Sequence, residues 1–74
     1  MNKMAYNEEV AEFLITVGSK NHYIEGENKG FTAPMFDQQD VWDTAGTLIE
    51  SHVLNVHLNW VSDSIVDIIW DKPN

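Results

Sequence analysis

The strongest constraint on the fold is an alternation of apolar and polar residues near the C-terminal end of the 74-residue chain. Positions 54–60 read LNVHLNW, so that every second side chain is apolar. This period is typical of a β-strand that buries one face. Positions 65–70, IVDIIW, are rich in β-branched residues and follow a Ser-Asp-Ser turn. The pattern therefore predicts a C-terminal antiparallel β-hairpin.

A helical interpretation of this segment is the alternative, because Asn55, Asn59, Ser62 and Asp67 also approximate a polar stripe. If the hairpin forms, its second face mixes apolar and polar residues: Val53, Asn55, His57, Asn59, Val61, Ile65, Asp67 and Ile69. Either the first helix covers this face, or the face is exposed and marks a surface for a partner or a second copy.

The most regular helical pattern begins at Asn7 and ends at Gly18. Asn7 is a suitable N-cap, acidic residues follow in the first turn, and Gly18 is a typical C-terminal stop. The apolar residues recur at helical spacing: Val10, Phe13, Leu14 and Val17, with Tyr6 close to the same side. We interpret this side as core.

Glycines and a proline interrupt the next segment, KNHYIEGENKGFTAP (20–34). Its short apolar pieces at 23–24 and 31–32 flank a polar turn, which predicts a short β-hairpin or a loop. A phosphate-binding loop is not indicated, because no Gly-Lys-Ser/Thr sequence follows and Glu25 and Glu27 would repel a phosphate.

A second short helix is predicted within FDQQDVWDTAG (36–46) and the residues that follow. Asp37 is a suitable N-cap, and Asp40 lies near the positive end of the helix dipole. Gly46 either ends this helix after about Ala45 or is tolerated inside a longer helix that reaches Ile49.

The two sides of this second helix differ in polarity. The apolar side contains Val41, Ala45 and Leu48, with Trp42 at its margin. The opposite side contains Asp40, Asp43, Thr47 and Glu50. Asp43 is the acid that local helix rules do not explain, because negative charge is mildly unfavourable towards a helix C-terminus.

The chain is strongly acidic, with 12 Asp and Glu against 4 Lys and Arg and a net charge of -8. All of its cations are lysines, and between Lys29 and Lys72 there is no cation at all. We therefore expect neither direct nucleic-acid binding nor attachment to an anionic membrane, since both need clustered Lys and Arg. The acidity either keeps the protein soluble or forms a binding surface.

Several kinds of site are not indicated. The chain contains no cysteine, so it has neither disulfides nor thiolate ligands. No zinc motif, calcium-loop spacing or serine nucleophile elbow occurs. We expect no catalytic residue, metal or cofactor and therefore no enzyme. The acidic start and the lack of a long apolar run predict a cytoplasmic protein.

Together these patterns predict a single small α+β domain over residues 1–74. The expected order is an N-terminal helix, a short β-hairpin or loop, a second short helix and the C-terminal antiparallel hairpin. The ends, 1–5 and 72–74, are expected to be flexible.

The function that best suits this composition is stoichiometric binding to a basic protein surface, in which carboxylates stand in for the phosphates of a nucleic acid. A nucleic-acid-processing enzyme that the protein inhibits is the expected partner. Trp42, flanked by Asp40 and Asp43, is the expected anchor, unless it is merely core. The candidate partner-binding residues are Asp37, Asp40, Trp42, Asp43, Glu50, Asp63, Asp67 and Asp71.

The local sequence VWDTAG, followed by the alternating strand that ends in LNW, resembles the helix-then-strand portion of the barstar family. These are small acidic ribonuclease inhibitors in which a Trp-Asp pair helps to engage a basic active site. The resemblance covers positions 41–60 and does not extend to the elements before and after them. It implies a precedent for inhibition by carboxylates.

The alternative function is a self-associating structural or accessory domain. It would form a homodimer or larger oligomer through the second face of the C-terminal hairpin or through an unpaired edge strand.

Overall fold

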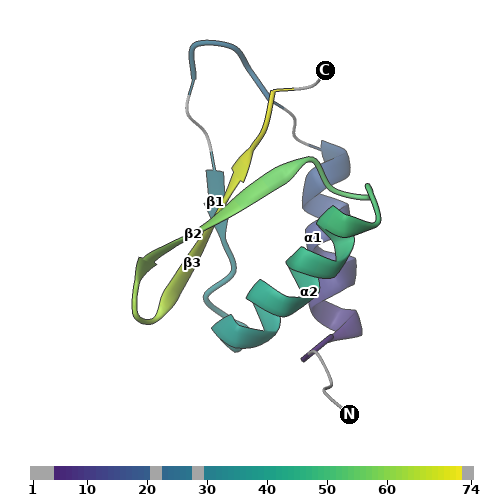
Figure 1. The fold of residues 1–74 in the computed structure, drawn as a ribbon, viewed down its shortest axis with the longest axis vertical. Helices are drawn as coiled ribbons and strands as arrows, with labels where there is room; N and C mark the ends of the chain where they lie inside the picture. The colour runs from purple at the N-terminus through teal and green to yellow at the C-terminus, as the bar shows by residue number, and fades with distance from the viewer. Residues whose placement is uncertain (1–4, 21–22, 28–29, 73–74) are drawn as a thin grey trace.

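The computed structural model describes residues 5–20, 23–27 and 30–72. The chain forms an α+β fold, as predicted, with two helices and a three-stranded antiparallel sheet in the strand order β1-β3-β2 (Figure 1). In chain order the elements are α1 (Glu8–Lys20), β1 (Gly30–Thr32), α2 (Gln38–Glu50), β2 (Val56–Ser62) and β3 (Ile65–Trp70).

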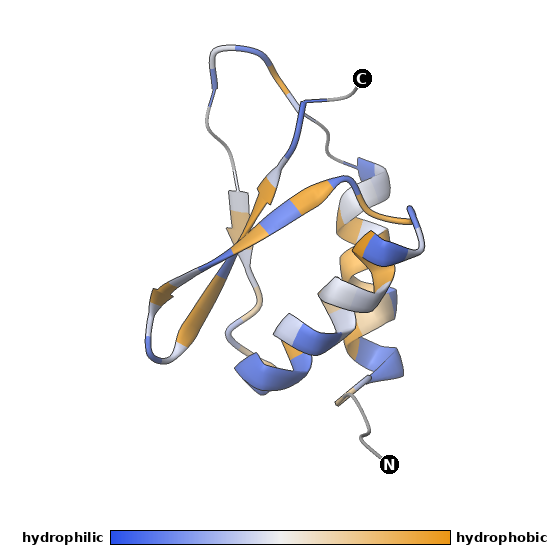
Figure 2. Cartoon of the chain, viewed as in Figure 1, coloured by the Kyte–Doolittle hydropathy of each residue, from blue (hydrophilic) through white to orange (hydrophobic). Residues whose placement is uncertain are grey.

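Strands β2 and β3 form the predicted hairpin, and β3 is the central strand of the sheet. Leu58 lies opposite Ile68, and Trp60 lies opposite Val66. Hydrophobic and hydrophilic residues alternate along β2 in Figure 2. The hairpin prediction is therefore confirmed, and the helical alternative for this segment is wrong.

Both helices pack against the same face of the sheet, so the molecule has two layers (Figure 1). The core between them consists of Val10, Ala11, Leu14, Ala33, Val41, Ala45, Leu48, Leu54, Val56, Val66 and Ile68. Aromatic rings extend this core between α1 and the sheet. The Phe31 ring lies 6.4 Å from the Phe13 ring and 5.2 Å from the Trp70 ring, centroid to centroid.

Helix α1 begins where the sequence predicts. The side-chain Oδ1 of Asn7 accepts hydrogen bonds from the backbone N–H groups of Glu9 at 2.9 Å and Val10 at 3.4 Å. The helix does not stop at Gly18 but continues to Lys20, so the predicted end is wrong. A Cβ atom at Gly18 would lie 3.0 Å from Leu54 Cδ2, which shows that this glycine allows close packing instead of ending the helix.

Residues 23–27 form a tight turn and not half of a hairpin. The N–H of Glu27 donates to the carbonyl of Ile24 at 3.1 Å, and Gly26 has a φ of 84°, in the left-handed region. The piece at 31–32 belongs to β1, which pairs with β3 and not with residues 23–24. The loop alternative is therefore correct here, and the local-hairpin alternative is wrong.

Helix α2 begins at the predicted cap. Asp37 Oδ1 accepts from the N–H groups of Gln39 at 2.9 Å and Asp40 at 3.3 Å. The helix passes through Gly46 and ends at Glu50, so the longer of the two predicted helices is the one that forms. The left-handed position that follows the helix is occupied by His52, with a φ of 61°.

The side chain of Gln38 connects α2 to the sheet. Its Oε1 accepts from the N–H of Val66 at 2.9 Å, and its Nε2 donates to the carbonyls of Ala33 and Phe36, both at 2.9 Å. Strand β1 ends at Thr32, opposite Asp67. The Gln38 amide therefore bridges β3 and the chain just beyond β1, and it fixes the start of α2.

The face of the sheet that points away from the helices has no covering element among the described residues. Its members are Gly30, Thr32, His57, Asn59, Ile65, Asp67 and Ile69. Helix α1 packs on the opposite face, where Phe13 meets Phe31. The alternative in which the first helix covers this face is therefore wrong.

Within the described part of the chain, no helix combines the length and the apolar character needed to cross a membrane.

Candidate functional site

Each of the three aspartates between positions 36 and 46 accepts hydrogen bonds within the fold. Asp37 caps α2. Asp40 Oδ2 accepts from Asn7 Nδ2 at 3.4 Å. Asp43 Oδ2 accepts from the N–H of Ala5 at 3.2 Å, and its Oδ1 accepts from Gln39 Nε2 at 3.2 Å. The carboxylate that local helix rules leave unexplained therefore holds the segment that precedes α1.

Thr44, which is not among the site residues predicted from the sequence, strengthens the same contact. This residue is fully buried. Its Oγ1 accepts from the N–H of Asn7 at 2.9 Å and donates to the carbonyl of Ala5 at 3.4 Å. A signal was available, because Thr44 lies three positions after Val41 and next to Ala45, on the core side of the helix. A hydroxyl at such a position needs a hydrogen-bond partner.

These hydrogen bonds fix the carboxylates without neutralising them. Every donor to Asp37, Asp40 and Asp43 named above is a backbone N–H or a side-chain amide, and none carries a positive charge. The ion pairs within the described residues are elsewhere. Lys72 Nζ lies 3.2 Å from Glu25 Oε1, and His57 Nδ1 lies 2.5 Å from Asp71 Oδ1.

The start of α1 brings further acids to the same end of the molecule. The hydrogen bonds from Ala5 and Asn7 hold this start against α2. Hydrophilic residues mark the N-terminal ends of both helices in Figure 2. We call the acids of this region the acidic end: Glu8, Glu9, Glu12, Asp37, Asp40 and Asp43.

An open hollow of about 310 Å³ lies between α1 and the segment that leads into α2. Glu9 and Glu12 line it together with Phe13, Thr16 and Phe36. The Phe13 and Phe36 rings meet edge to face, with their centroids 5.7 Å apart. The hollow thus has an apolar part beside two carboxylates. Neither glutamate was among the candidates chosen from the sequence, because the pairing of the two helices is a long-range contact.

Trp42 lies at the margin of the core, as the helical wheel predicts. Its side chain is half-buried and stacks on Trp60, with ring centroids 5.5 Å apart and an interplanar angle of 23°. This contact joins α2 to β2. The packing gives Trp42 a structural role, and its role as a partner anchor stays a prediction.

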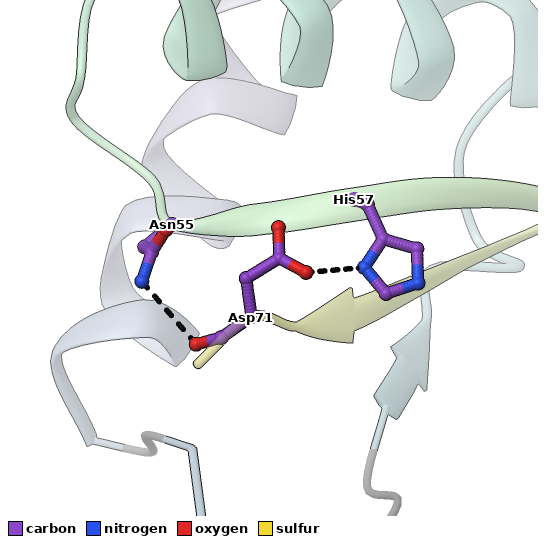
Figure 3. A network of polar contacts seen from close by, with 3 residues as sticks. All are labelled: Asn55, His57 and Asp71. Carbon is purple, nitrogen blue, oxygen red and sulfur yellow. Dashed lines mark hydrogen bonds and ion pairs between the residues drawn. The ribbon is translucent and has the colours of Figure 1, made fainter. Parts of the chain in front are cut away.

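The remaining candidates lie away from the acidic end. Glu50 is the last residue of α2, Asp63 is in the turn of the hairpin, and Asp67 lies on the uncovered face of the sheet. Asp71 follows β3 and pairs with His57, while its carbonyl accepts from Asn55 Nδ2 at 3.2 Å (Figure 3). The structure therefore divides the predicted set, and only Asp37, Asp40 and Asp43 share one region with the acids of α1.

Among the residues that the structure describes, no three His, Asp or Glu side chains are grouped so that they could hold a metal ion.

Comparison with known proteins returns no match to a family model, to a curated protein or to a solved structure.

Proposed function

We propose that this protein binds stoichiometrically to a positively charged surface on another protein, and that the acidic end makes the contact. The observation that carries the proposal is the set of carboxylates on two paired helices, whose described hydrogen-bond donors are all uncharged. A basic partner would supply compensating charge, which none of the described donors to these carboxylates carries.

The geometry favours binding in two ways. Residues three positions apart on a helix have Cβ atoms roughly 5–6 Å apart, so Asp37, Asp40 and Asp43 form a row of negative charges. Asp40 and Asp43 are also held by Asn7 and Ala5, which lowers the entropy lost when a partner binds. The net charge of -8 adds long-range attraction that speeds the encounter with a basic surface.

We propose a nucleic-acid-processing enzyme as the partner and inhibition as the outcome. Grooves that hold DNA or RNA carry clustered lysines and arginines, and a row of fixed carboxylates presents such a groove with the charge that phosphates normally supply. Occupation of the groove blocks access of the nucleic acid. The proposal involves no chemical step, metal or cofactor.

The experiment is affinity capture from cell lysate with the full chain as bait, at low and high salt, followed by mass spectrometry. We expect one basic nucleic-acid enzyme that is lost at high salt and displaced by added DNA or RNA. A partner retained at high salt and unaffected by nucleic acid would argue against mimicry of phosphates.

A further inference from the structure

Strand β2 is an edge strand, and its side away from β3 is unpaired among the described residues. The N–H of Asp71 donates to the carbonyl of Asn55 at 3.0 Å. Backbone groups in an antiparallel ladder alternate between the two sides of a strand. The N–H and C=O groups of Val56, Leu58 and Trp60 therefore point to the free side.

This edge strand contains no Asp, Glu, Lys or Arg. Its sequence is VHLNWVS, whereas these four residue types make up 22% of the chain. Edge strands that stay unpaired are usually protected by lysine, proline, inward-pointing charge or short length. The other edge strand, β1, is protected by its length of 3 residues. In β2 the only irregularity lies between Trp60 and Ser62, which leaves residues 56–60 as a regular free edge.

We infer that β2 pairs with β2 of a second copy of this chain, antiparallel, about a twofold axis at Leu58. In this register Leu58 lies opposite its own equivalent, and Trp60 lies opposite Val56 of the second copy. The two sheets become continuous, and the free N–H and C=O groups of each strand bond to the other. The strand also offers apolar surface, because its Trp60 is 38% exposed.

Charge favours a second copy over a basic partner at this edge. A basic protein is attracted to the carboxylates of the acidic end and finds none on β2. Two copies, each with a net charge of -8, repel each other, so they approach most easily through the strand without acids. This inference is independent of the proposed function, since the acidic end lies on the helices and not on β2.

The first test is sedimentation equilibrium of the full chain over a range of protein and salt concentrations. We expect a species with twice the mass of the 8.5 kDa chain, and its fraction rises with salt because salt screens the repulsion. Binding at the acidic end has the opposite salt dependence, so the two proposals can fail separately. A monomer under all conditions would overturn the dimer.

The second test locates the dimer interface by crosslinking. Because the chain contains no cysteine, a single introduced cysteine is the only thiol that can react. Asn59→Cys introduces a thiol on the exposed outer side of β2, close to its equivalent in the paired strand. A short bis-maleimide should link this variant into dimers far more efficiently than a Ser19→Cys control. The thiol of the control is also exposed, but it lies on α1, away from β2. Equal yields from the two variants would contradict pairing through β2.

A third variant distinguishes loss of the dimer from loss of folding. Asn59→Lys adds the charge that usually protects an edge strand, and Asp67 lies opposite it on β3, so the monomer keeps a favourable neighbour. We expect this variant to sediment as a monomer with an unchanged circular dichroism spectrum. A folded variant that stays dimeric would place the interface elsewhere.

Discussion

At the scale of single residues, the acids of α2 serve the fold as well as the surface. Asp43 holds Ala5, Asp40 contacts Asn7, and Asp37 caps the helix. Helix rules alone predict the cap, because it depends on residues next to it in the chain. The contacts of Asp40 and Asp43 with residues 5–7 are more than thirty positions apart in sequence, with separations of 33 and 38. No local pattern contains that information.

Thr44→Val tests the attachment of the N-terminal segment. The valine keeps the shape of threonine but leaves the N–H of Asn7 and the carbonyl of Ala5 without this partner. We expect a loss of about 1–3 kcal/mol in the free energy of unfolding, measured by urea denaturation. Thr16→Val, at an exposed position of α1, is the control and should change stability little. Equal effects of the two substitutions would mean that the Thr44 contacts do not stabilise the fold.

Gln38→Glu tests the amide that bridges α2 and β3. The change removes the donor to Ala33 and Phe36 and brings a carboxylate towards their carbonyl oxygens. We expect a loss of about 2 kcal/mol or more, because two hydrogen bonds are replaced by repulsion. Gln39→Glu adds the same charge at the next position and loses the bond to Asp43, but that bond is exposed to solvent, so water screens the repulsion and the change should cost much less. The comparison uses urea denaturation, and a Gln38→Glu protein as stable as the control would rule out the bridging role.

At the scale of elements, alternation of apolar and polar residues predicts the hairpin and the capping residues predict both helix starts, but local patterns do not predict the helix ends. Gly18 and Gly46 have the same local character as helix stops, and the helices run through both. Gly18 faces Leu54, a contact between distant parts of the chain, whereas a Cβ at Gly46 would have nothing within 4 Å. The pattern around positions 31–32 predicts only a local hairpin or a loop for the same reason, since the partner of β1 is the distant strand β3.

The two glycines should respond differently to alanine. Gly46→Ala should raise the free energy of unfolding by about 1 kcal/mol, because alanine is the better helix former and the site is open. Gly18→Ala should give a smaller gain or a loss, since its Cβ would lie 3.0 Å from Leu54 Cδ2. Thermal unfolding of both variants beside the wild type measures the difference. A larger gain at Gly18 than at Gly46 would contradict this account of the helix ends.

At the scale of the whole molecule, charge was the most informative property of the sequence. The net charge of -8 indicates an acidic protein but does not say which acids lie together. The sequence favoured the acids between positions 37 and 71, whereas the paired helices bring Glu8, Glu9 and Glu12 to Asp37, Asp40 and Asp43. Asp67 is separated from this group by the sheet itself.

The net charge also has a consequence for stability. With a charge of -8, repulsion among the carboxylates opposes the compact state. We therefore expect the urea midpoint to rise as sodium chloride is added, because the salt screens this repulsion. Asp40→Asn with Asp43→Asn should reduce the salt effect while keeping the side-chain shapes. A midpoint that falls with salt would mean that attractive ion pairs dominate the folded protein.

Charge-matched variants in the capture experiment test whether the acidic end binds a basic protein. One bait carries Glu9→Gln and Glu12→Gln, and the other carries Glu50→Gln and Asp63→Asn, so both lose the same charge from exposed positions. We expect the first bait to lose the basic partner at moderate salt while the second retains it. Loss of the partner from both baits alike, or from the second bait alone, would contradict a contact at the acidic end.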